Sequence, residues 1–250
     1  MRATGSSGFE SIPLVDQSGR TVRLADFRGK VVVLAPFFTL GADDVPLTTG
    51  AFELLQRWLL GAGLAGQVVL AEVSVDPQED DPSMLAAYAR RVGSSWYLLS
   101  GKARALRALW KDFGVSYQVI TETVPEEGNW LDGQPLTRDV NYTEGVFVLD
   151  RRGHKRFTAI GRPDPGGVLP PALASMLDED GLDDLDSPSG STWTPAGVLD
   201  DVSKLIGQGR KLGQGRNTLD QPRSNGITGI GRGHPATRYP TAPMAAWSRW

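Results

Sequence analysis

The chain has 250 residues, of which 40% are hydrophobic and 22% are charged, a composition that supports a folded core in a soluble protein. This length predicts one or two domains. The formal net charge of −3 provides no general attraction to nucleic acid or anionic membranes. The absence of cysteine excludes thiol redox chemistry, disulfides, thiolate metal sites and cysteine nucleophiles. Because His154 and His234 are the only histidines, a three-histidine metal site is excluded as well.

The sequence contains no segment that we expect to cross a membrane. Its longest apolar stretch, residues 31–38, is far shorter than the roughly 18 residues that spanning requires. Residues 1–8 lead into Phe9 without the apolar stretch of a secretory signal. We therefore expect a soluble, cytoplasmic protein as the chain is written. Removal of a presequence would instead place it in the periplasm or the mitochondrial intermembrane space.

Apolar runs and helical patterns alternate along the first part of the chain, as in an α/β domain. In chain order we expect a hairpin of residues 9–15 and 21–24, strands at 31–38, 68–75, 96–99, 115–123, 145–149 and 155–160, and helices at 47–59, 83–92, 106–113 and 168–177. Trp58, Trp96 and Trp110 fall on the expected core-facing positions. This order predicts a thioredoxin-like fold: a mixed central sheet flanked by helices, with an N-terminal β-hairpin.

Several segments of this domain resemble the Sco/SenC family of thioredoxin-fold copper chaperones for cytochrome oxidase assembly. Residues 38–47 are similar to its Phe-Thr-x-Cys-x-x-x-Cys-Pro segment, 75–82 to its Asp-Pro-x-x-Asp-x-Pro, Leu85 and Tyr88 to its Leu-x-x-Tyr, 96–101 to its Trp-x-x-Leu-Thr-Gly, and 141–150 to the Asp-His-(Ser/Thr) segment before its closing strand. The resemblance covers about residues 9–177 and implies the same fold.

The positions of the family's copper ligands depart from its pattern. The family holds copper through two thiolates four residues apart and one distal histidine, and these positions are Gly41, Val45 and Tyr142 here. A hydrogen atom and an isopropyl group cannot bind a metal, so the resemblance implies a degenerate member without copper binding. We expect no cofactor, no metal site and no catalytic residue, since no other nucleophile has an adjacent base.

Two groups of carboxylates allow alternative interpretations. Asp43, Asp44 and Glu144 would lie near the former copper site, where oxygen ligands could hold a hard cation. The interpretation we favour is a solvated loop with an acidic helix start. Asp76 and Asp80 are either a pair for acid–base chemistry or a turn followed by a helix N-cap.

The composition changes near residue 178, where the chain becomes rich in glycine, proline, serine and aspartate. We divide the chain into a flexible N-terminus (1–8), the Sco-like domain (9–177), an acidic linker (178–203) and a basic tail (204–250). The tail carries eight lysines and arginines against Asp220 alone. Disorder is its default interpretation; RNA binding is an alternative, and a dinucleotide-binding loop lacks the required strand and helix.

Aromatic and arginine side chains are the candidates for protein contacts, because they dominate interface energetics. The candidates are Trp130, Trp193, Arg210, Arg216, Arg232, Tyr239, Trp247 and Trp250. We expect a non-catalytic structural or interaction subunit, or an assembly factor, whose tail wraps a protein partner. The alternative is a copper chaperone that works without its own thiolates. The resemblance favours a respiratory or other membrane-associated complex; nucleic acid is not expected.

Overall fold

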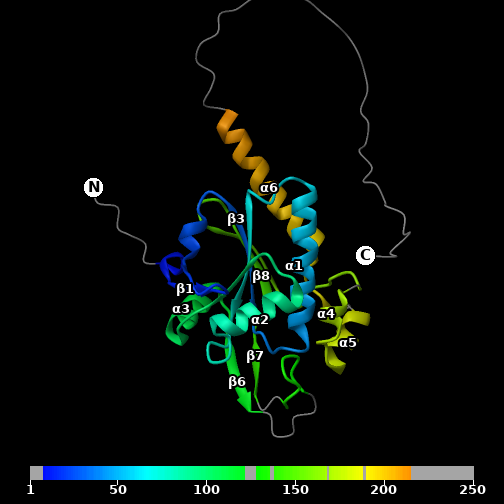
Figure 1. Cartoon of the computed structure of the whole chain (residues 1–250). Helices are drawn as coiled ribbons and strands as arrows, with labels where there is room; N and C mark the ends of the chain where they lie inside the picture. The colour runs from blue at the N-terminus through cyan, green and yellow to red at the C-terminus, as the bar shows by residue number, and fades with distance from the viewer. Residues whose placement is uncertain (1–7, 122–127, 136–137, 168, 188–189, 215–250) are drawn as a thin grey trace, which may run out of the picture.

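A seven-stranded mixed sheet forms the centre of the protein (Figure 1). The computed structural model describes residues 8–121, 128–135, 138–167, 169–187 and 190–214, with side chains as far as residue 207. The strand order is β2-β1-β5-β4-β3-β8-β9, from Thr21–Val22, Leu14–Asp16, Tyr97–Ser100, Val68–Ser74, Val31–Phe37, Gly145–Leu149 and Lys155–Ile160. A separate two-stranded sheet pairs β6 (Tyr117–Thr121) with β7 (Arg138–Tyr142).

The middle of the large sheet is parallel, because β3 pairs with β4 and β4 with β5 in the same direction. The crossovers are α1 (Asp44–Gly61) and α2 (Pro82–Val92), and right-handed connections in one direction place both helices on the same face. Every residue of β3 and β4 is buried, as their continuous apolar runs predict for strands covered on both faces. The thioredoxin-like fold class is thus confirmed.

Helix α3 (Ala103–Phe113) packs through Trp110 and Phe113 against Phe147 of β8. Its apolar residues at positions 106, 109, 110 and 113 are all buried, which confirms the helical spacing read from the sequence. Trp96 is also buried, but Trp58 is 38% exposed, so its expected core position was wrong. Leu55 and Leu59 occupy the buried face of α1 instead.

Three elements differ from the expected ones. The first strand is short, because η1 (Phe9–Ser11) precedes β1. The expected final helix is only one turn, α4 (Pro171–Ala174), which begins with Pro171 at its first position. Strand β7 was not expected; it forms the antiparallel partner of β6.

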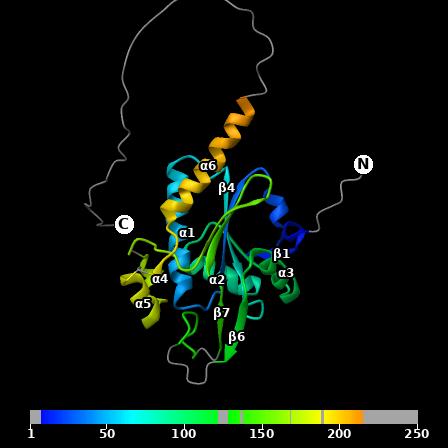
Figure 2. The same cartoon turned by 180° about the vertical axis from the view of Figure 1, so that it is seen from behind.

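The expected linker at 178–203 is corrected by the structure, because two helices occupy this region. Helix α5 (Glu179–Asp186) begins where the Asp178 side chain accepts a hydrogen bond from the Gly181 backbone N–H at 2.8 Å. Helix α6 (Pro195–Gln214) follows and lies beside α1 (Figure 2). Its buried residues are Val198, Val202, Leu205 and Ile206. The domain therefore continues past residue 177. The acidic composition led to the prediction of a linker, although the apolar residues of α6 have helical spacing.

Much of the expected tail lies outside the described residues. Arg216, Arg232, Tyr239, Trp247 and Trp250 belong to this part of the chain, as do residues 1–7 at the other end. The backbone at position 210 is helical, while the Arg210 side chain is not described. Among the described helices, none has the length and hydropathy needed to span a bilayer.

Candidate functional site

The loop between β3 and α1 and the first turn of α1 carry the first two degenerate ligand positions. Gly41 precedes α1 and Val45 lies in its first turn, fully buried. A Cβ atom added at Gly41 would collide with Val45 Cγ2 and would come within 2.9 Å of Phe38 Cε1. A larger residue therefore does not fit at position 41 unless both neighbours move.

Tyr142, at the third ligand position, packs against the same loop. Its ring meets Phe38 edge-on, with centroids 6.0 Å apart. Phe38 thus lies next to Gly41 and also against the ring of Tyr142. We call Phe38, Gly41, Val45 and Tyr142 the apolar cluster.

Copper does not fit the side chains of the apolar cluster. They are a hydrogen, an isopropyl group and two aromatic rings, with no thiolate or imidazole for a soft cation. The Tyr142 hydroxyl is enclosed and has no hydrogen-bond partner among the described residues. Burial, followed by the negative charges of Asp44 and Asp43, raises the pKa of Tyr142 well above its ordinary value, so the phenol keeps its proton.

Asp43, Asp44 and Glu144 gather beside this cluster; we call them the acidic cluster. Burial, then the charges of Asp43 and Glu144, raise the pKa of Asp44 to about 9. Burial is also the main cause that raises the pKa of Asp43 and of Glu144. Because Asp44 is only 8% exposed, the expectation of a solvated loop was wrong at this residue.

The acidic cluster does not have the arrangement of a metal centre. Among the described residues, no group of three or more histidine, aspartate or glutamate side chains could hold a metal ion. Arg162 lies close enough to lower the pKa of Asp44 and Glu144, and it forms an ion pair with Asp184 of α5. The negative charge of the acidic cluster is therefore partly balanced by a guanidinium group nearby.

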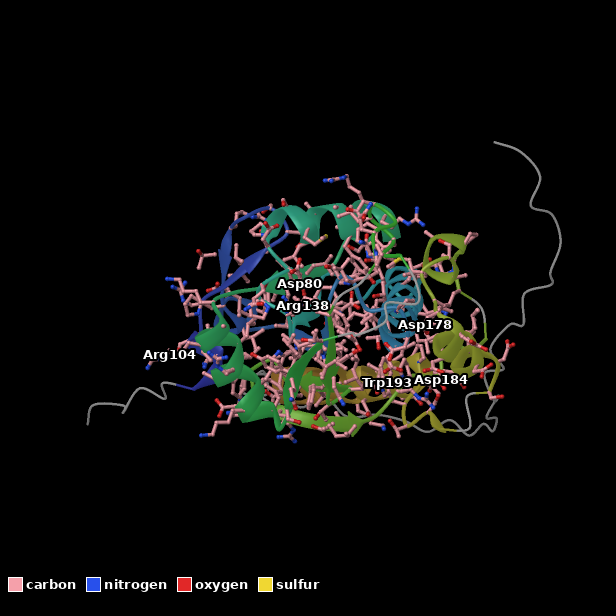
Figure 3. All side chains as sticks on the ribbon, turned by 90° about the horizontal axis from the view of Figure 1, so that it is seen from below. Asp80, Arg104, Arg138, Asp178, Asp184 and Trp193 are labelled. Atoms are coloured by element: carbon pink, nitrogen blue, oxygen red, sulfur yellow. The ribbon has the colours of Figure 1, made fainter. Side chains whose placement is uncertain are left out.

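Helix α5 covers the loop that carries these residues. The backbone N–H of Asp178 donates to the carbonyl oxygen of Ala42 at 2.9 Å. A Cβ added at Gly181 would lie 2.8 Å from the Asp43 carbonyl oxygen, so α5 approaches the loop as closely as glycine allows. Figure 3 shows Asp178 and Asp184 together at this side of the molecule.

Asp76 and Asp80 have separate structural roles. Asp80 is buried and accepts hydrogen bonds from the backbone N–H and the hydroxyl of Thr39, at 3.0 and 2.6 Å, which holds the end of β3. Burial raises the pKa of Asp80 to about 7. Asp76 forms an ion pair with Arg138 of β7, with Oδ1 and Nη2 2.6 Å apart. The N-cap of α2 is Asp81, the next residue after Asp80.

Two tryptophans expected at an interface are part of the fold. Trp130 is half-buried; its Nε1–H donates to the Thr39 carbonyl oxygen at 2.6 Å and its ring meets Tyr88 edge-on. Trp193 is 6% exposed, and its Nε1–H donates to the Gly161 carbonyl oxygen at 3.0 Å. Trp193 is thus buried, while Trp130 keeps part of its ring exposed. His154, one of the two histidines, lies in an exposed turn between β8 and β9.

Comparisons with known proteins find one family. The family model described as SCO1/SenC matches residues 6–163. Copper-bound ScoI from Bradyrhizobium japonicum has 19% identity, covers 66% of this chain and 94% of its own, and superimposes with a TM-score of 0.51. Apo Sco1 from Thermus thermophilus has 25% identity, with coverages of 74% and 99% and a TM-score of 0.46. A search of the curated proteins finds no match. Helices α4, α5 and α6 all lie beyond the matched residues; we call residues 164–214 the extension.

Proposed function

The chain belongs to the SCO1/SenC family, and we propose that it is a non-catalytic member that serves as a structural or interaction subunit, or as an assembly factor, of a larger complex. The apolar cluster carries this proposal. A copper protein that had lost its ligands alone would keep space for the metal, whereas here the Val45 side chain fills the space beside Gly41. The fold is retained while the chemistry of its site is replaced by packing.

The extension supports the same proposal. It covers the β3–α1 loop through the Asp178–Ala42 hydrogen bond and the close approach of Gly181. A chaperone that passes a metal ion through this loop would need the loop accessible to its partner. In this chain α5 occupies that face, so we assign partner binding to other parts of the molecule, including residues 215–250 with their five arginines and two tryptophans.

Copper binding tests the proposal directly. The full chain is mixed anaerobically with Cu(I) and a chromophoric chelator, and the chelator is expected to retain the metal. A matched variant, Gly41→Cys/Val45→Cys/Tyr142→His, returns the family's ligands and replaces the Val45 side chain that obstructs position 41. We expect copper transfer only to the variant. Tight binding of one equivalent by the natural chain would overturn the proposal.

The alternative is a copper chaperone without thiolates of its own. The acidic cluster is the observation that favours it, because these carboxylates lie beside the former ligand positions. Carboxylates suit hard cations better than Cu(I), so a partner would have to donate soft ligands. Under this alternative Asp44→Asn/Glu144→Gln would abolish metal uptake in the presence of the partner. Unchanged uptake would eliminate it.

Partner binding is tested by cross-linking in cells. The full chain is compared with a chain that ends at Gln214, because α6 must remain for the core to stay covered. We expect a defined set of cross-linked proteins to be lost with residues 215–250. The same set with both chains would move the contact to the folded domain, and the absence of cross-linked proteins with either chain would contradict a subunit role.

A further inference from the structure

A groove of about 510 Å³ lies between the last two strands of the sheet and the extension. Its floor includes Val146 and Val148 of β8 and Ala159 of β9, and its wall includes Trp193 and Val198. The volume is within the range of small-ligand sites, which combine apolar walls with a few polar groups. Trp193 and Val198 belong to the extension, whereas the β8 and β9 residues lie within the part that the family model matches.

The groove has an acidic rim. Asp164, Asp200, Asp201 and Lys204 line it, so three carboxylates face one ammonium group. Lys204 is paired with Asp201, with Nζ and Oδ1 2.8 Å apart. Asp164 accepts a hydrogen bond from the Gly166 backbone N–H at 2.7 Å, and neither Asp164 nor Asp200 has an ion-pair partner among the described residues. The rim therefore has an excess of negative charge after its internal pair is counted.

The surroundings of Lys204 indicate that the groove stabilises a positively charged group. Its Nζ lies 5.8 Å from the centroid of the Phe157 ring, another lining residue, as in a cation–π contact. The hydrogen bond and charge of Asp201, with a further contribution from Asp200, raise the pKa of Lys204. An ammonium group on an aliphatic stem is thus already held between carboxylates and an aromatic ring at one end of the groove.

We propose that this groove binds an organic cation, an ammonium or guanidinium group carried on an apolar stem. Asp164 and Asp200 provide the negative charge for the cation, and the half-exposed Phe157 and Ala159 side chains provide the apolar surface for the stem. The Lys204 ammonium is an internal competitor for the same carboxylates. This site is independent of the degenerate copper positions, which lie in the β3–α1 loop and β7.

Isothermal titration of the full chain with 2-phenylethylammonium tests the site. The matched probes are 2-phenylethanol, which lacks the charge, and 3-phenylpropionate, which reverses it. We expect the ammonium to bind about tenfold more tightly than the alcohol, the propionate not to bind, and the ammonium to bind more weakly as salt is added. Absence of ammonium binding, or equal affinity for the alcohol, would overturn the proposal.

Substitutions give expected effects of opposite sign. Asp164→Asn/Asp200→Asn removes the charge but keeps the shape, and should weaken ammonium binding about tenfold. Lys204→Met keeps the aliphatic stem and releases Asp201, so it should strengthen binding several-fold. Asp183→Asn, on the exposed side of α5, is the control and should change nothing. A groove that merely packs hydrocarbon would show neither effect, and weaker binding by Lys204→Met would contradict the assigned competition.

Discussion

The backbone N–H of Asp178 donates a hydrogen bond to the carbonyl oxygen of Ala42, 2.9 Å away. This bond joins the N-cap of α5 to the loop that, in the SCO1/SenC family pattern, carries the two cysteines. Ala42 lies next to Gly41, and the Asp178 side chain simultaneously caps α5 through Gly181. The extension and the degenerate loop are therefore parts of one folded unit. A substitution in either segment should alter the packing of the other.

Gly181→Ala is expected to destabilise the protein. The new Cβ would lie 2.7 Å from Leu177 Cδ2 and 2.9 Å from the Ala42 carbonyl oxygen, so α5 would have to move away from the loop. We expect a loss of about 2 kcal/mol in the free energy of unfolding, measured by urea denaturation. Gly61→Ala at the end of α1 is the control, because nothing lies within 4 Å of its added Cβ. Equal effects of the two substitutions would contradict the close packing of α5.

A chain that ends at Leu177 should fail to fold, whereas one that ends at Gln214 should be as stable as the full chain. Helix α6 buries Val198, Val202, Leu205 and Ile206, and each such side chain contributes up to about 2 kcal/mol. Their sum is comparable with the whole stability of a typical domain. Circular dichroism and thermal unfolding of both chains provide the measurement. A cooperative transition of the shorter chain at the same temperature would show that the extension is dispensable.

Glu72 should make stability fall as the pH rises. Its carboxyl is fully buried in β4, where it accepts hydrogen bonds from Thr49 and Trp96, and burial raises its pKa from 4.5 to about 7. The folded protein thus holds a proton that the unfolded chain releases, so this stability is present below pH 4.5 and lost as the pH rises through 7.

The difference for Glu72 amounts to about 3 kcal/mol. Urea unfolding of the natural chain and of Glu72→Gln across this pH range provides the measurement, and the variant should lose that share of the pH dependence. Asp80, whose pKa is also raised to about 7, should leave a remaining slope in the variant. Glu179→Gln at the exposed start of α5 is the control. The prediction fails if Glu72→Gln retains the full pH dependence.

Arg138→Met should destabilise the protein by about 3 kcal/mol, because it leaves the buried Asp76 carboxylate without its partner. The Asp76 side chain is 3% exposed and its Oδ1 lies 2.6 Å from Arg138 Nη2. Arg138 also donates to Gln78 Oε1 at 2.8 Å, so it joins β7 to the turn after β4. A double-mutant cycle with Asp76→Asn measures the coupling by urea unfolding. Additive effects would show that the pair makes no net contribution.

The local pattern of the chain was sufficient for most of the central sheet and its helices. Because β3 and β4 are uninterrupted runs of apolar residues, both faces of the sheet must be covered at these strands. The helical spacing of the apolar residues in α3 similarly defines one buried face. Helix α6 shows where this reasoning failed: its apolar spacing was present, but the acidic and glycine-rich composition around it suggested a linker.

The absence of cysteine excluded thiolate chemistry whatever the fold, because composition alone determines which atoms exist to bind a metal. What occupies the space at the former ligand positions 41, 45 and 142 is decided by the tertiary structure. Whether Gly41 leaves a cavity depends on where Phe38 and Val45 point, and the proton on Asp44 depends on its burial beside Asp43 and Glu144. Packing density and the dielectric surroundings of a carboxylate arise from segments distant in sequence, so only the folded chain decides them.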